Sequence, residues 1–126
     1  MTLEEIKNEI NGEVIVGAEK LSIELKTAFA ADLMSDVLAF ARSGCLLITG
    51  LTTAQSVRTA FALDIAAIVI CRGKTPQEQA VDIARELHIP IIRTDYIMFE
   101  TIGILYSAGI CGCIREVCSG DNTCGV

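Results

Sequence analysis

Short apolar runs alternate with segments of helical periodicity through the first 110 residues. The runs "CLLIT" (45–49), "AAIVIC" (66–71) and "IPIIRT" (89–94) lack the polar alternation of a half-exposed strand. Continuous apolar strands are typical of parallel sheets that are covered on both faces. Between them, apolar residues recur every three or four positions, which predicts helices. Because each strand is followed by a helix, we expect a small layered α/β domain with a mainly parallel sheet flanked by helices.

Capping signals predict where several helices begin. Thr2 and Glu5 fit a capping box at the start of the chain. The helix after the predicted strand over 25–32 is expected to be capped by Asp32 or Ser35. The strongest signal is Thr75-Pro76-Gln77-Glu78, which combines an N-cap threonine, a proline at the first helical position and a glutamate three residues after the cap.

The last helix, predicted from 95 to about 108, carries two apolar stripes. One can serve the core, and the second consists of Phe99, Ile102 and Tyr106. A one-sided surface helix needs only one such stripe. The second stripe is therefore either buried between layers or in contact with another subunit. Both alternatives stay open, and we expect a homodimer that uses this helix.

Composition narrows the class of protein. A chain of 126 residues is one domain that can enclose a single core. The longest apolar run, Ile65 to Cys71, is far short of the roughly 18 residues of a membrane span. No basic segment followed by an apolar one opens the chain, so we expect no signal peptide and a cytoplasmic location. The net charge of −6 and the scattered basic residues argue against binding to nucleic acid or to an anionic membrane.

Polar residues and glycines follow the predicted strands, where parallel sheets bind ligands. Glycines allow close approach, threonines present hydroxyls beside helix N–H groups, and Arg72 can pair with an anion. The alternative is that the threonines are helix caps and the glycines are turns. No dinucleotide or nucleoside-triphosphate motif is present. The candidate ligand-binding residues are Asp32, Ser35, Thr49, Gly50, Thr52, Thr53, Arg72, Gly73, Thr94 and Asp95.

Catalytic chemistry has little support in the sequence. The single histidine, His88, falls in the last turn of a predicted helix, where a cap or surface role is expected. No nucleophile and base can be paired around it. Asp32 and Asp36 are four residues apart, but Asp32 is better explained as a cap. We therefore expect a protein that is not an enzyme.

Several segments together resemble the DRTGG domain family over about residues 1–110. They are "DLMSDVLAFA", "CLLIT", "LDIAAIVICRGKTP" and "AxELxIPIIRTDYIMFET". The residues that give the family its name are absent: the strand ends read Gly50-Leu51-Thr52 and Cys71-Arg72-Gly73 instead. The family's ligand contacts therefore cannot be transferred residue by residue.

The resemblance implies a compact α/β fold similar to the N-terminal domain of HPr kinase. It also implies a non-catalytic regulatory module that is commonly dimeric. Such modules are found beside CBS domains in inorganic pyrophosphatases and in long phosphotransacetylases. Stand-alone versions look like accessory proteins of anaerobes, some near iron hydrogenase genes.

Four of the six cysteines crowd the predicted C-terminal tail, residues 111–126, while Cys45 and Cys71 are expected in the core. The tail cysteines are Cys111, Cys113, Cys118 and Cys124. Thiolates so close together can bind one zinc ion or iron–sulfur cluster, although the spacing lacks the usual C-x2-C pair. A redox-active or disulfide-forming tail and an inert tail remain alternatives.

Two functions follow from these observations. The first is a regulatory, ligand-sensing or interaction module, with an adenine nucleotide or another phosphorylated metabolite expected near Thr52, Thr53 and Arg72. The second is a metal- or cluster-carrying accessory protein that serves a redox or metabolic enzyme, such as an iron hydrogenase, through its tail cysteines.

Overall fold

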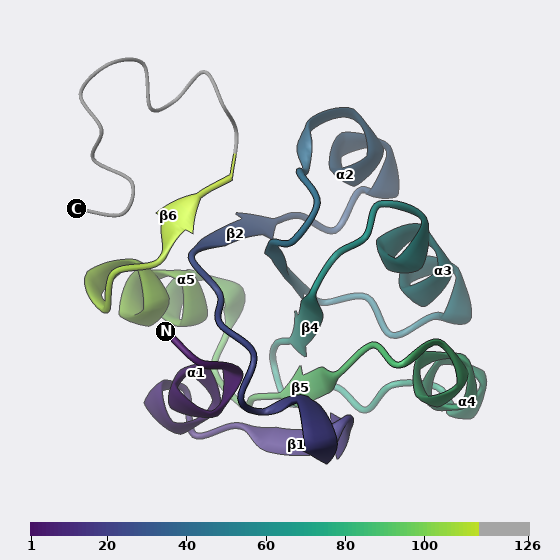
Figure 1. Ribbon diagram of the computed structural model, residues 1–126, viewed down its shortest axis with the longest axis horizontal. Helices are drawn as coiled ribbons and strands as arrows, with labels where there is room; N and C mark the ends of the chain where they lie inside the picture. The colour runs from purple at the N-terminus through teal and green to yellow at the C-terminus, as the bar shows by residue number, and fades with distance from the viewer. Residues whose placement is uncertain (114–126) are drawn as a thin grey trace.

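The computed structural model describes residues 1–113, and within them it confirms the predicted α/β architecture with a mainly parallel sheet. The strands form one sheet in the order β1-β5-β4-β3-β2-β6 (Figure 1). They are β1 (Glu13–Val16), β2 (Thr27–Ala30), β3 (Leu46–Thr49), β4 (Ala67–Ile70), β5 (Ile91–Arg93) and β6 (Cys111–Gly112). The helices are α1 (Leu3–Glu9), α2 (Met34–Phe40), α3 (Ala54–Ala62), α4 (Glu78–Leu87) and α5 (Met98–Ser107), with a short 3-10 helix η1 (Ala18–Lys20).

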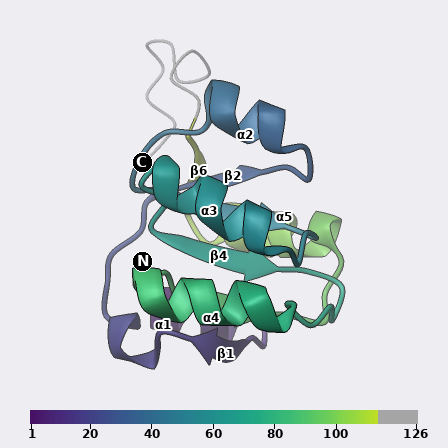
Figure 2. The same cartoon turned by 90° about the vertical axis from the view of Figure 1, so that its right-hand side faces the viewer.

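The sheet is parallel except at one edge. Strands β2 to β5 pair in parallel, and β6 pairs in parallel with β2. Only β1, next to β5, runs antiparallel. Helices α2, α3 and α4 cover one face, and α1 and α5 cover the other, as Figures 1 and 2 show.

The two faces of the sheet explain the unbroken apolar runs of the sequence. Every residue of β3 and β4 is buried. Successive side chains point to opposite faces, so Leu47 packs with α2–α4 while Leu46 and Ile48 pack with α1 and α5. Since fully burying one such side chain contributes about 1.5–3 kcal/mol, these central strands account for much of the stability.

The predicted capping box at the start of α1 is confirmed. The Thr2 hydroxyl accepts from Glu5 N–H at 3.1 Å, and the Glu5 carboxylate accepts from Thr2 N–H at 2.8 Å.

The two other predicted caps are wrong. Helix α4 begins at Glu78 with Gln77 as its N-cap, not Thr75. Gln77 N–H donates to the Thr52 carbonyl at 2.9 Å, and this bond holds the segment before the helix in an extended course. Helix α2 begins after Leu33 without a side-chain cap, because Asp32 turns toward β3 instead.

The alternative in which the second apolar stripe of α5 is buried between layers is also wrong. Phe99 is 82% exposed, Tyr106 69% and Ile102 36%, whereas Leu105 of the other stripe is buried. Contact with another subunit stays a prediction.

The sheet continues past the predicted domain boundary at residue 110. In β6, Cys111 pairs with Thr27 and Gly112 with Ala28. Cys113 N–H then donates to the Ala28 carbonyl at 3.1 Å. The other two tail cysteines, Cys118 and Cys124, lie outside the described residues. None of the helices within residues 1–113 is long and apolar enough to cross a membrane.

Candidate ligand site at the carboxyl edge of the sheet

The carboxyl ends of four neighbouring parallel strands form one row. Asp32 follows β2, the segment 50–53 follows β3, Arg72 and Gly73 follow β4, and Asp95 follows β5. The structure thus brings the sequence-predicted candidates to one edge, with Ser35 in the first turn of α2. Ligand binding by these residues stays a prediction.

Asp32 organises the end of β3. Its carboxylate accepts from Gly50 N–H at 2.7 Å and from the Thr49 hydroxyl at 2.9 Å. The Thr49 hydroxyl in turn accepts from Leu51 N–H at 3.2 Å. Asp32 therefore fixes the turn that follows β3, a role that the expectation of a helix cap missed.

Lys74, which the sequence did not single out, ties the loop after β4 to the loop after β3. Its Nζ donates to the Gly50 carbonyl at 3.0 Å. A second bond, from Gln77 N–H to the Thr52 carbonyl, joins the same two loops. The only advance signal was a lysine four residues beyond the end of β4 in "CRGKT", which does not reveal that its side chain bends back to Gly50.

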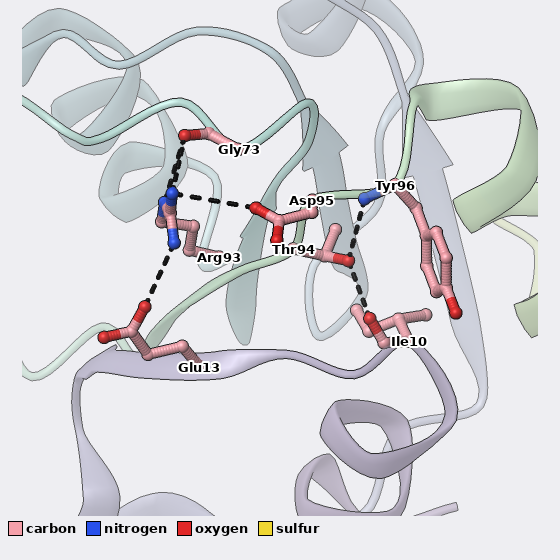
Figure 3. A network of polar contacts seen from close by, with 7 residues as sticks. All are labelled: Ile10, Glu13, Gly73, Arg93, Thr94, Asp95 and Tyr96. Carbon is pink, nitrogen blue, oxygen red and sulfur yellow. Dashed lines mark hydrogen bonds and ion pairs between the residues drawn. The ribbon is translucent and has the colours of Figure 1, made fainter.

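The topological switch point of the sheet lies between β4 and β5, because α4 and α5 leave these strands toward opposite faces. Here Arg93 donates to the Gly73 carbonyl from both Nε (3.1 Å) and Nη2 (2.8 Å), and it pairs with Glu13 at 3.1 Å and Asp95 at 3.7 Å (Figure 3). The guanidinium therefore links the loop after β4 to β1 and to the residue that follows β5. Arg93 is a further residue that sequence reasoning missed.

Gly73 is required by this crowded turn. Its φ is +65°, and a Cβ would lie 2.9 Å from Asp95 Oδ1. Gly50 differs, because a Cβ there would meet nothing closer than 3.5 Å. Both polar groups of Gly50 already have partners, its N–H in Asp32 and its carbonyl in Lys74.

The threonines of this edge fall into two groups. In one group the hydroxyl bonds within the fold, and in the other it has no partner within residues 1–113. Thr49 and Thr94 are buried, and each hydroxyl both donates and accepts within the fold. Thr53 caps α3 by accepting from Ser56 N–H. By contrast, no hydrogen bond or ion pair within residues 1–113 engages the side chains of Thr52, Ser35 or Arg72. These three are the predicted site residues that a ligand can reach without displacing another contact.

Reactive groups are poorly placed for chemistry here. Cys71 follows β4, but burial raises the pKa of its thiol above the ordinary value, and nearby Asp32 adds to this effect more weakly. A thiol with a raised pKa is a poor nucleophile at neutral pH. His88 is the C-cap of α4, at the opposite edge of the sheet, with a φ of +59°.

A pair of buried thiols lies at the amino end of β3. Cys45 and Cys113 are 0% and 3% exposed and share one core cluster. Burial, and secondly the neighbouring Cys113, raises the pKa of Cys45 to about 12. Among residues 1–113, no three metal-ligating side chains come together. The four-cysteine metal site stays a prediction.

These features define a small α/β domain with a row of parallel strand ends at one edge of its sheet. A family model described as the DRTGG domain matches residues 5–108. The chain therefore belongs to the DRTGG domain family, which confirms the resemblance noted in the sequence.

A solved structure shares the fold. It contains the CBS and DRTGG domains of the regulatory region of Clostridium perfringens pyrophosphatase, complexed with the activator diadenosine tetraphosphate. The TM-score is 0.70 at 19% identity, and the match covers 82% of this chain but 45% of that one. No curated protein sequence matches the chain.

Replacing Thr94 by Val should destabilise the protein by about 1–3 kcal/mol, because the Ile10 carbonyl loses the bond that joins α1 to β5. Thr52→Val is the matched control, and we expect a change within about 0.5 kcal/mol because its hydroxyl has no partner in the described chain. Urea unfolding followed by circular dichroism measures both. Equal effects would contradict the division of the threonines into these two groups.

For the tail cysteines, we predict that Cys118→Ser and Cys113→Ser both release a bound metal. Cys113→Ser should also lower the melting temperature of the metal-free protein, because the Cys113 side chain is packed in the core. Elemental analysis of protein purified without oxygen gives the metal content. Zinc or iron below roughly a tenth of an equivalent per chain would contradict the metal site.

Proposed function

We propose that this chain is a regulatory module that binds an adenine nucleotide or another phosphorylated metabolite at the carboxyl edge of its sheet and performs no chemistry itself. The observation that carries the proposal is that the cation Lys74 bonds to the loop that opens α3, with a second cation, the exposed Arg72, two residues before it in the loop after β4. Neither forms an ion pair with a carboxylate in the described part of the chain, whereas Arg93 beside them forms two.

Phosphate recognition follows from this arrangement. The first turn of a helix leaves backbone N–H groups without intrahelical partners, and they favour an anion. Helix α3 begins at Ala54 after its cap Thr53, directly beyond the segment that Lys74 contacts. The Thr52 hydroxyl is available beside it. A phosphoryl group can thus accept from a cation, a hydroxyl and backbone amides together.

The structural neighbour supports the choice of nucleotide as the first ligand to test. The regulatory region that it represents was captured with an adenine dinucleotide activator. Such a module would act in the cytoplasm by passing ligand binding to a metabolic or redox enzyme. The buried Cys71 thiol and the distant His88 agree with a sensing role rather than a catalytic one.

We also propose that the module is a homodimer formed through α5. Phe99, Ile102 and Tyr106 leave an apolar stripe in water on one helix, flanked by the half-exposed Ile97. Large exposed apolar surfaces of this kind mark interaction sites. Two copies can cover the stripe by a symmetric contact, in which each α5 packs on the other.

Saturating ATP or diadenosine tetraphosphate should raise the melting temperature, because a ligand present at 100 times its Kd adds about 2.7 kcal/mol to the free energy of unfolding. For a domain of this size, that corresponds to a shift of several degrees. Arg72→Ala should reduce the shift, and the measurement is a thermal-unfolding titration. If no phosphorylated compound shifts the melting temperature, the proposed function is wrong.

Light scattering at micromolar concentration should give the mass of a dimer. Phe99→Glu should convert it to a folded monomer, because the charge cannot be buried in an apolar interface. The control is Phe61→Glu, which places the same charge at a 54% exposed phenylalanine on α3 and should leave the dimer intact. A wild-type monomer, or equal effects of the two substitutions, would remove the α5 interface.

A further inference from the structure

Lys74 stands at the centre of a polar chain that crosses three strand ends. Asp32, after β2, accepts from Gly50 N–H, and Lys74, after β4, donates to the Gly50 carbonyl. Gly50, after β3, is therefore held at its N–H by a carboxylate and at its carbonyl by an ammonium. A Cβ on Gly50 would lie 3.5 Å from both Asp32 carboxylate oxygens and 3.7 Å from Lys74 Nζ, so the two charged groups flank this residue closely.

The ammonium of Lys74 has hydrogen-bonding capacity to spare. A lysine carries three donors, and within residues 1–113 only the bond to the Gly50 carbonyl uses one. The side chain is half-buried, and no carboxylate in this part of the chain forms an ion pair with it. A neutral carbonyl is a weaker acceptor than an anionic oxygen. Lys74 is thus a positioned cation that forms no ion pair within residues 1–113, although the Asp32 carboxylate lies nearby at Gly50.

We propose that Lys74 is the specificity-determining cation of the carboxyl edge: it donates to an anionic oxygen of the ligand while keeping its bond to the Gly50 carbonyl. This inference rests on the proposed function and identifies the residue that recognises the negative charge of the ligand at the carboxyl edge. It also gives the ligand a way to act on the protein, because the same ammonium then joins the ligand to the loop over residues 50–53.

Arg72 is the weaker candidate for this role. Its backbone is fixed in the left-handed region at a φ of +64°, and its N–H donates to the Tyr96 carbonyl at 2.8 Å. Its side chain, however, is exposed and has no partner in the described chain. Ordering a long exposed side chain costs conformational entropy that the positioned Lys74 has already lost in part.

Coupling follows from the two bonds that join the loops after β3 and β4. The Lys74 and Gln77 bonds hold the segment 50–53 against the loop after β4. A ligand that engages Lys74 fixes its side chain further and strengthens this connection. The expected signature is slower hydrogen exchange of the 50–53 amides when the ligand is bound, and its loss when Lys74 is replaced by an uncharged side chain of similar length.

The test is isothermal titration calorimetry with ATP and with diadenosine tetraphosphate, using wild-type protein and four variants. Lys74→Met should weaken binding by about tenfold or more, as expected for loss of a hydrogen bond to a charged group. Lys74→Arg should recover part of the affinity. Arg72→Met should change it less than Lys74→Met. Lys26→Met, which removes the same charge before β2 at the opposite edge, should leave it unchanged.

Each outcome decides a separate point. If the wild-type protein binds neither nucleotide, the proposed function and this inference both fail. If it binds and Lys74→Met binds equally well, or loses no more than Lys26→Met or Arg72→Met, the role of Lys74 fails and the proposed function stands. Hydrogen exchange at 50–53 that slows equally in wild type and Lys74→Met would overturn the coupling.

Discussion

The burial of the central strands on both faces is the constraint on which the rest of this structure depends. Every side chain of β3 and β4 is buried, and all but that of Thr49 lie in one of the two apolar layers. Polar and charged groups can therefore emerge only where the strands end. Since β2 to β5 are parallel neighbours, their carboxyl ends meet at one edge, and the polar side chains that follow these strands gather there.

That edge is a connected polar network. Asp32 holds Gly50 at its N–H and Lys74 holds it at its carbonyl, and Arg93 ties the end of β5 to the loop after β4 by its bonds to Gly73. Such ties give the loops a defined geometry before any ligand arrives, which reduces the entropy lost on binding. These ties also distinguish the cations of the edge. Arg93 is paired with Glu13 and Asp95, whereas Arg72 and Lys74 have unused donors within residues 1–113.

The sequence predicted the layered fold and the edge because both follow from short-range patterns. Unbroken apolar strands identify a covered parallel sheet, and Thr2 with Glu5 identifies the first helix start. The failures concern contacts between segments distant in sequence. Thr75 looks like a cap, yet a bond from Gln77 to Thr52 moves the start of α4. Asp32 also looks like a cap, yet it serves Gly50, eighteen positions along the chain.

The roles of Lys74 and Cys113 were hidden for the same reason. Lys74 acts through Gly50, twenty-four positions away, and Cys113 packs beside Cys45 only because β6 joins the sheet next to β2. A local pattern carries no information about which loop a lysine side chain reaches, or about which strand a two-residue segment joins.

Backbone amide shifts during a titration with diadenosine tetraphosphate test the central claim, that the carboxyl edge is the ligand site, most directly. Two-dimensional NMR of the isotopically labelled protein resolves the amides of Gly50, Thr52, Gly73 and Lys74 from those of α5. The account predicts that the largest shifts fall in the segments 50–53 and 72–74. Shifts confined to α5, or to the opposite edge around His88, would contradict it.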